Sequence, residues 1–429
     1  MSIGVALSRL KPAVLAVCVL LALADPAAAQ SAASPAAGSG PRFRADGPDA
    51  DARGRTQGYP VCARETWFRD KRCLVGALSG FDQLYPARII AAPKAPARLG
   101  RVPSEPSIRY SYAGQDLTLD QYLDSHPITG FLIAKGDSIL VERYQYARTD
   151  RHRLTSFSMA KTIVALLIGV AVKEGAIRSI DDPAEVYVPG LKGTEYGRTP
   201  IKALLQMSSG VLFREVYTDP TSDIATLARL TLGQDPGGSL AAVKQFNTRL
   251  VPPGRRFSYA SAETVVLGLV LAQATHKSVS NYVREKLWEP LGAEADANWT
   301  IDATGQEIAF AYFNAVLRDW ARLGLMLAHD GTWQGKSIVP REWLLASTTL
   351  APGDGHLRLG PPWSGYGYQT WIVEGPRRMF ALRGYRGQFV IVDPDTKLVL
   401  VQTAVRPGSD NFADAELLAL WQAAAAQLR

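Results

Sequence analysis

The sequence predicts an α+β fold: one antiparallel sheet made from both chain ends and flanked by helices, with a mainly helical domain inserted between the two halves. Three observations predict it. A β-hairpin is expected within residues 130 to 144, helical and loop-rich sequence fills residues of about 176 to 276, and strand-like segments return from residue 367. One half of the sheet is therefore expected to come from the sequence before the insert, and the other half from the sequence after it.

The composition is that of an ordinary globular protein. The chain has 429 residues, of which 47% are hydrophobic and 20% charged, so it is long enough for one large domain or two closely packed ones. Its formal net charge of +7 comes from lysines and arginines that are dispersed along the chain. This dispersal argues against a nucleic-acid partner and favours ordinary surface solvation.

The first 29 residues have the three parts of a secretory signal peptide. Arg9 and Lys11 precede an apolar run over residues 13 to 23, and small residues end the segment at residues 27 to 29. An uncleaved membrane anchor is the alternative. Because no later stretch reaches about 18 apolar residues, we expect no stable membrane insertion after cleavage. The protein is thus predicted to be exported, either to the periplasm or outside the cell.

Two further segments are expected before the main domain. Residues 30 to 58 are rich in Ala, Ser, Gly, Pro, Arg and Asp, and we predict a disordered tether there. Residues 59 to 106 contain five prolines after residue 85, which favours an extended N-terminal arm. The main domain is expected over residues 107 to 429.

The elements of that domain follow from local patterns. Gly136 and Asp137 separate two β-rich segments, which is a strong hairpin signal. Apolar runs and caps predict helices after Ser158 and over residues 201 to 207, 222 to 232, 264 to 272, 307 to 328 and 413 to 428. Strands are expected over residues 367 to 373, 380 to 388, 389 to 392 and 397 to 402.

Ser158 and Lys161 form the first candidate for chemistry. Ser158 stands where small and polar residues give way to the apolar run of residues 163 to 172, so it should begin a buried helix. Lys161 follows three residues later and projects from the same helical face. A serine in contact with a lysine is a nucleophile with its own base.

Two more motifs make a family resemblance specific. Ser158-Met159-Ala160-Lys161, then Tyr259-Ala260-Ser261, then a glycine-rich strand at Gly384 resemble the three ordered motifs of the serine β-lactamase and penicillin-binding-protein superfamily. The resemblance covers residues 107 to 429. Tyr-x-Ser is similar to the class C β-lactamase and esterase branch. Residues 204 to 211 and 217 to 223 most resemble the 6-aminohexanoate-dimer hydrolases, which are amidases of that branch.

The resemblance implies a role for each motif residue. Lys161 would be the base for Ser158, and Tyr259 would share protons with Lys161 and pass one to the leaving group. The backbone N–H groups of Ser158 and Tyr385 would form the oxyanion hole beside Gly384. Tyr217 would hydrogen-bond the scissile amide. The other implied substrate-binding residues are Ser261, and Asp219 and Asp223 for a substrate amine.

The third motif departs from the family pattern. Leu382 takes the place of the cationic Lys or His that helps to hold the carboxylate of a β-lactam, which puts efficient penicillin hydrolysis in doubt. Arg383 or Arg386 could restore the charge. Because side chains alternate along a strand, the sequence leaves open which of the two faces the site.

We therefore expect an exported serine hydrolase that cleaves an amide or ester of a small molecule or peptide through an acyl-enzyme on Ser158. A non-hydrolytic protein that binds penicillin or cell-wall peptide is one alternative, and an acyltransferase on the same fold is another. No cofactor and no metal are expected, because the five histidines are scattered and no phosphate-binding glycine loop occurs.

A disulfide between Cys62 and Cys73 is the first testable prediction. Cys18 would leave with the signal peptide, and an even number of cysteines in an oxidising compartment favours pairing over two free thiols. Peptide mapping of the unreduced protein by mass spectrometry should find the two cysteines in one linked peptide. Alkylation of both thiols without prior reduction would contradict it.

Overall fold

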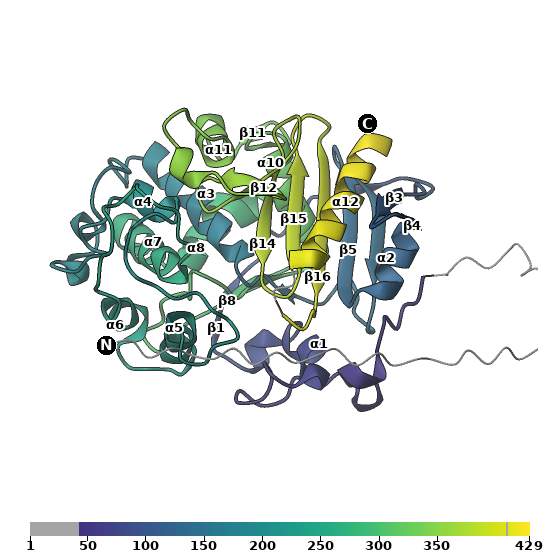
Figure 1. Ribbon diagram of the computed structural model, residues 1–429, viewed down its shortest axis with the longest axis horizontal. Helices are drawn as coiled ribbons and strands as arrows, with labels where there is room; N and C mark the ends of the chain where they lie inside the picture. The colour runs from purple at the N-terminus through teal and green to yellow at the C-terminus, as the bar shows by residue number, and fades with distance from the viewer. Residues whose placement is uncertain (1–42, 409–410) are drawn as a thin grey trace, which may run out of the picture. The chain divides into compact units, whose positions relative to one another are not determined.

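The computed structural model describes residues 43–408 and 411–429, and its main sheet has strands from both parts of the sequence (Figure 1). In spatial order its strands are β12 (Trp363–Tyr366), β13 (Trp371–Val373), β14 (Phe380–Gly384), β15 (Gln388–Asp393), β16 (Leu398–Ala404), β5 (Ile128–Lys135), β6 (Ser138–Tyr144) and β2 (Gly100–Arg101). All neighbouring pairs are antiparallel except β2 and β6, which are parallel.

The pairing of β5 with β16 joins the two halves of the sheet. Leu132 lies opposite Val401, and Ala134 lies opposite Val399. The sheet made from both chain ends, which the sequence predicted, is confirmed. The hairpin of β5 and β6 also turns at Gly136 and Asp137, as expected.

Helices cover both faces of the sheet, and the apolar strands supply side chains to both. Alternate residues of β5 point to opposite sides: Phe131 and Ile133 pack with Trp421 of α12 (Asn411–Gln427). Leu132 and Ala134 belong instead to the core that contains α3 (Met159–Lys173) and α10 (Leu317–Ala328). Strands buried on both faces read as continuous apolar runs, which explains the composition of β15 and β16. In Figure 1, α12 lies across the outer face of these strands.

Residues 176 to 276, the predicted helical insert, contain four α-helices. These are α4 (Ile201–Leu205), α5 (Asp223–Leu232), α6 (Gly238–Lys244) and α7 (Ser261–Thr275), and they are followed by α8 (Val279–Val283), a π-helical turn (Arg284–Trp288) and α9 (Glu289–Leu291). Helix α7 packs directly against α3. Both helices are apolar around most of their circumference because both lie inside the core.

A second sheet was not predicted. Its strands are, in spatial order, β1 (Ala87–Ile90), β8 (Ala297–Thr300), β9 (Phe313–Ala315) and β7 (Leu154–Thr155). The helix expected over residues 307 to 328 therefore begins only at Leu317, which is a correction. The Ser156 N–H donates to the Phe313 carbonyl at 2.9 Å, so this sheet fixes the backbone just before Ser158.

The smaller elements complete the described chain. They are α1 (Leu74–Ala77), α2 (Leu119–Ser125), the hairpin β3 (Arg109–Tyr112) and β4 (Gln115–Thr118), the hairpin β10 (Thr332–Trp333) and β11 (Lys336–Ser337), and α11 (Arg341–Thr348). None of the helices described here is long and apolar enough to cross a bilayer.

The segment before residue 59 is ordered where the structure describes it, so the predicted disorder is wrong for residues 43 to 58. Two 3₁₀ turns, Asp51–Arg53 and Arg55–Gln57, lie there. Arg53 is buried and donates to the Val405 carbonyl at 2.8 Å. Hydrogen bonds and ion pairs thus order a segment that has little apolar surface. The remainder of the predicted tether, and the predicted signal peptide, lie outside the described residues.

The arm of residues 59 to 106 contributes one strand to each of the two larger sheets: β1 to the second sheet and β2 to the main sheet. Its two cysteines lie together: the Cys62 and Cys73 Sγ atoms are 1.92 Å apart and the Cα atoms 5.7 Å apart. The loop between them contains Trp67 and Phe68 and reaches towards the end of β14, where the Phe68 ring stacks on Tyr385 with 5.9 Å between the ring centroids.

Helix α3 packs so tightly against α11 that Gly169 has no room for a side chain. A Cβ there would lie 2.4 Å from the Trp343 indole. We expect Gly169→Ala to lower the free energy of unfolding by roughly 1–3 kcal/mol, because overpacking outweighs the gain of about 1 kcal/mol in helix propensity. Urea unfolding would measure this change. Gly353→Ala, which meets no atom within 4 Å, is the control. A Gly169→Ala protein as stable as the control would contradict this packing.

Candidate active site

Ser158 and Lys161 are in direct contact at the start of α3. Ser158 is the residue before the helix, and Lys161 lies on its first turn. The Lys161 Nζ lies 2.8 Å from the Ser158 Oγ and 2.8 Å from the Phe310 carbonyl oxygen. Lys161 is only 1% exposed, whereas Ser158 is partly exposed and lines a cavity. The arrangement leaves the serine open to a ligand and its partner shielded from water.

Burial changes the acid–base behaviour of Lys161. Removal of the ammonium from water disfavours the charged form and lowers the pKa of Lys161 to about 7, although the charge of Glu215 opposes this shift. A substantial fraction of the side chain is therefore the neutral amine at neutral pH. A neutral amine 2.8 Å from a hydroxyl is able to accept its proton.

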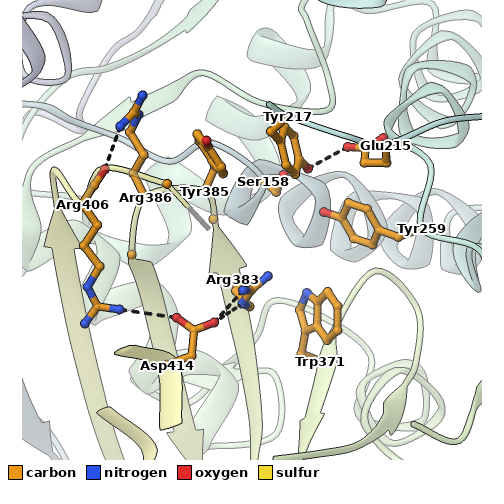
Figure 2. A pocket seen from close by; sticks show the side chains of 13 residues that line it. Ser158, Glu215, Tyr217, Tyr259, Trp371, Arg383, Tyr385, Arg386, Arg406 and Asp414 are labelled. Carbon is orange, nitrogen blue, oxygen red and sulfur yellow. Dashed lines mark hydrogen bonds and ion pairs between the residues drawn. The ribbon is translucent and has the colours of Figure 1, made fainter. Parts of the chain in front are cut away.

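Tyr259 lies beside Ser158, with its hydroxyl towards the serine (Figure 2). Its ring centroid is 5.2 Å from the Lys161 Nζ. The ring also stacks on Trp371 with 5.7 Å between centroids. Burial raises the pKa of Tyr259 above its usual value near 10, so the hydroxyl keeps its proton at neutral pH. The structure brings together the three residues that the motifs suggested.

The end of β14 approaches the segment before Ser158 closely at Gly384. A Cβ on Gly384 would come within 2.2 Å of the Ser156 carbonyl oxygen, so any side chain there would push the strand away. Tyr385 follows directly and packs its ring against Phe157 and Tyr217, at centroid distances of 5.7 and 4.6 Å. The strand predicted to supply the second oxyanion donor thus lies beside Ser158.

Glu215 is a site residue that the sequence analysis missed. Its carboxylate accepts hydrogen bonds from the Tyr217 hydroxyl at 2.7 Å, the Ser261 hydroxyl at 2.6 Å and the Ser261 N–H at 2.9 Å. It thereby links two predicted substrate-binding residues and holds the Tyr217 side chain beside Ser158 (Figure 2). A single glutamate in a loop belongs to no sequence motif. Its position two residues before Tyr217 is the signal that could have indicated its role.

The side chains of the third motif point in different directions, which decides which of them line the cavity. Leu382 is fully buried in the core and lies outside the cavity lining. Arg383 lines the cavity, and its Nε donates to Asp414 at 2.8 Å (Figure 2). Arg386 also lines the cavity, but it is 5% exposed and donates to the Arg406 and Phe68 carbonyls.

Two other predicted residues have structural partners. Asp219 pairs with Arg214 and accepts two hydrogen bonds from Thr221, at 2.8 Å from its N–H and 2.7 Å from its hydroxyl. Asp223 accepts the Arg214 N–H at 2.7 Å. These contacts shape the loop before α5, and they leave less capacity for a substrate amine than the sequence suggested.

The cavity around Ser158 has a volume of about 200 Å³. The residues that line it (Figure 2) come from the start of α3, from the loop before α5, from the segment before α7, from β13 and β14, and from α12. The site is therefore assembled where the sheet and the helical insert meet. Within residues 43–408 and 411–429, no group of three or more His, Cys, Asp or Glu side chains is placed to hold a metal ion.

Most of this chain is similar to known proteins. The Beta-lactamase family model matches residues 116–425. The chain is 30% identical over 322 residues to a 6-aminohexanoate-dimer hydrolase from Paenarthrobacter ureafaciens, a match that covers 72% of this chain and 81% of the relative.

Solved structures show the same fold. A proposed 6-aminohexanoate-dimer hydrolase from Bacillus anthracis matches with a TM-score of 0.76 and 24% identity, over 84% of this chain and 96% of the other. A penicillin-binding protein homologue from Caulobacter crescentus matches with a TM-score of 0.56 and 19% identity, over 71% and 93% of the two chains. By its match to the family model and its 30% identity to a curated member, this chain is a serine hydrolase that belongs to the Beta-lactamase family.

Proposed function

We propose that this protein is an exported amidase that hydrolyses a small linear or peptide-like amide through an acyl-enzyme on Ser158. The observation that carries the proposal is the contact of 2.8 Å between the Ser158 Oγ and a buried Lys161 Nζ whose pKa is lowered to about 7. A serine that only binds a ligand has no need of a base at this distance. The family membership and the name of the relative from Paenarthrobacter ureafaciens support hydrolysis of an amide.

Acylation begins with the neutral amine of Lys161. It takes the Ser158 Oγ proton while the Oγ attacks the amide carbonyl carbon, which gives a tetrahedral oxyanion and a lysine ammonium. The N–H groups of Ser158 and Tyr385 are the donors for that oxyanion, and Gly384 permits the close approach that this requires. The second sheet holds the backbone just before Ser158, and β14 ends directly before Tyr385, which supports this assignment.

Expulsion of the amine needs a proton on the leaving nitrogen. Tyr259 supplies it, because its raised pKa keeps the hydroxyl protonated, and the Lys161 ammonium then returns a proton to Tyr259. The C–N bond breaks and the acyl group stays on Ser158. Water then attacks the ester carbonyl and gives a proton to the same pair. The acid product leaves, and the Ser158 hydroxyl regains its proton.

The surroundings of the third motif favour amides over penicillins as substrates. Leu382 is buried in the core and so offers no cation to a β-lactam carboxylate. Arg383 is held by Asp414, with its guanidinium 5.4 Å from the Trp371 ring centroid. Tyr217 donates its hydroxyl proton to Glu215, so its oxygen would accept a hydrogen bond from the N–H of the scissile amide.

Export is proposed from the sequence of the first 29 residues, which has the pattern of a signal peptide. The proximity of Cys62 and Cys73 supports it, because disulfides persist in oxidising compartments.

Covalent labelling tests the nucleophile. A fluorophosphonate probe should label the wild type at Ser158, and Ser158→Ala should remove the label. Lys161→Ala should lower kcat/KM for a p-nitroanilide by about 10²–10⁴-fold, which is the usual contribution of a general base. Lys173→Ala, on the exposed last turn of the same helix, should leave both readouts unchanged. Labelling that persists in Ser158→Ala would refute the proposal.

The pH dependence tests the protonation states. Only the neutral Lys161 amine accepts the serine proton, so kcat/KM should rise about tenfold per pH unit below pH 7 and level off above it. Because the pKa of Tyr259 is raised, no fall is expected up to about pH 9. A pH–rate profile with an uncharged substrate would measure both limbs. A rising limb centred near pH 10 would mean that Lys161 is not the base.

A further inference from the structure

The turn after β14 contains the proposed oxyanion donor Tyr385, and its backbone has an unfavourable conformation. Strand pairing ends with Gly384 opposite Gln388, so Tyr385, Arg386 and Gly387 form the turn between β14 and β15. Arg386 has a φ of 64° and Gly387 a φ of 90°, so both are left-handed. Glycine adopts this conformation freely, but an arginine does not. The turn therefore needs contacts that hold it in place.

The side chain of Arg386 supplies some of these contacts, and one of them reaches the N-terminal arm. The guanidinium donates to the Arg406 carbonyl at 2.7 Å (Figure 2) and to the Phe68 carbonyl at 2.8 Å. Its central carbon lies 4.8 Å from the Phe68 ring centroid and 5.2 Å from the Tyr385 ring centroid. Both distances are typical of cation–π contacts. Arg386 therefore joins the turn to the arm at Phe68.

The Phe68 ring also packs directly on the turn. It is stacked on the Tyr385 ring, with 5.9 Å between the centroids and 20° between the planes. Trp67 meets the Phe68 ring edge-on at a centroid distance of 5.2 Å. Phe157 and Tyr217 contact the Tyr385 ring as well. The Tyr385 side chain is thus held between the arm and the residues beside Ser158.

The loop that contains Phe68 is itself fixed. It is closed where Cys62 meets Cys73, and a short closed loop leaves its residues few alternative positions. Trp67, the neighbour of Phe68, is 3% exposed, and its indole N–H donates to the Tyr85 hydroxyl at 3.1 Å. The loop is therefore rigid enough to support the turn against which it packs.

We propose that Phe68 is a positioning residue of the oxyanion hole: its ring and its carbonyl, through Tyr385 and Arg386, hold the turn in the conformation that directs the Tyr385 N–H to the oxyanion. This inference rests on the proposed chemistry at Ser158. It adds to that chemistry a part of the chain outside residues 116–425, the segment that the family model matches. Phe68 acts through the turn and needs no contact with the substrate.

Steady-state kinetics with a p-nitroanilide test the proposal. The variant Phe68→Leu keeps an apolar side chain in the arm, but leucine can neither stack on Tyr385 nor attract Arg386 through a π face. We expect kcat to fall about tenfold while KM changes less than about twofold, because an oxyanion donor acts mainly in the transition state and its complete loss costs about 10²–10³-fold. Phe68→Tyr keeps the ring and should retain the kcat of the wild type.

Val61→Ala is the matched control. Val61 also packs against the core from the arm, but it does so beside Gly80 and does not line the cavity around Ser158. Its kcat should stay within about twofold of the wild type, and cooperative thermal unfolding should show that both variants are folded. An unchanged kcat in Phe68→Leu, an equal loss of kcat in Val61→Ala, or a change confined to KM would overturn the proposal.

Amide hydrogen exchange separates this inference from the proposed function, because it needs no turnover. In Phe68→Leu the amides of residues 384 to 388 should exchange at least about threefold faster than in the wild type, whereas those of β16 should be unchanged. Val61→Ala should match the wild type in both segments. Unchanged exchange of the turn in Phe68→Leu would overturn the inference even if Ser158 cleaves amides. Faster exchange in a protein without any Ser158-dependent labelling or cleavage would instead uphold the support of the turn by Phe68 and refute the proposed chemistry.

Discussion

The burial of the Lys161 amine is the constraint on which the rest of the structure depends. A lysine exposed to water stays protonated and is no base at neutral pH, so its side chain has to be enclosed by apolar groups. The enclosure comes from α3 itself, from Phe310 between β8 and β9, and from the ring of Tyr259. These residues come from widely separated parts of the sequence. A large core of sheet and inserted helices is what brings them to one serine.

Much of the fold could be predicted from the sequence, because the patterns that indicate its helices and strands are local. The hairpin at Gly136, the buried helix after Ser158 and the strands near the end of the chain each have their own period and turn residues. The second sheet could not be found in this way. Its strands are two to four residues long and pair across distant parts of the chain. Such short segments have no measurable period.

The candidate site was predictable from the sequence to the same extent as the fold, because its signals are also local. Ser158, Lys161 and Tyr259 belong to spaced motifs, whereas Glu215 is a single loop residue whose meaning depends on folded contacts with Tyr217 and Ser261. Residues 43 to 58 were predicted to be disordered because they contain few apolar residues. The segment is ordered instead by polar contacts, such as the hydrogen bond from Arg53 to a backbone carbonyl. Specific polar contacts of this kind produce no recognisable pattern in the sequence.

The pairing of β5 with β16 has a consequence for how the protein acquires activity. Thr129 and Thr403, whose hydroxyls hydrogen-bond at 2.9 Å across these strands, are 274 positions apart in the sequence. Contacts of such long range form slowly, because a large loop has to close first. The environment that neutralises Lys161 is thus complete only after the strands near residue 400 have joined the sheet. A partly synthesised chain contains Ser158 and Lys161 but lacks the surroundings that neutralise the amine, so the proposed base would form only when assembly is finished.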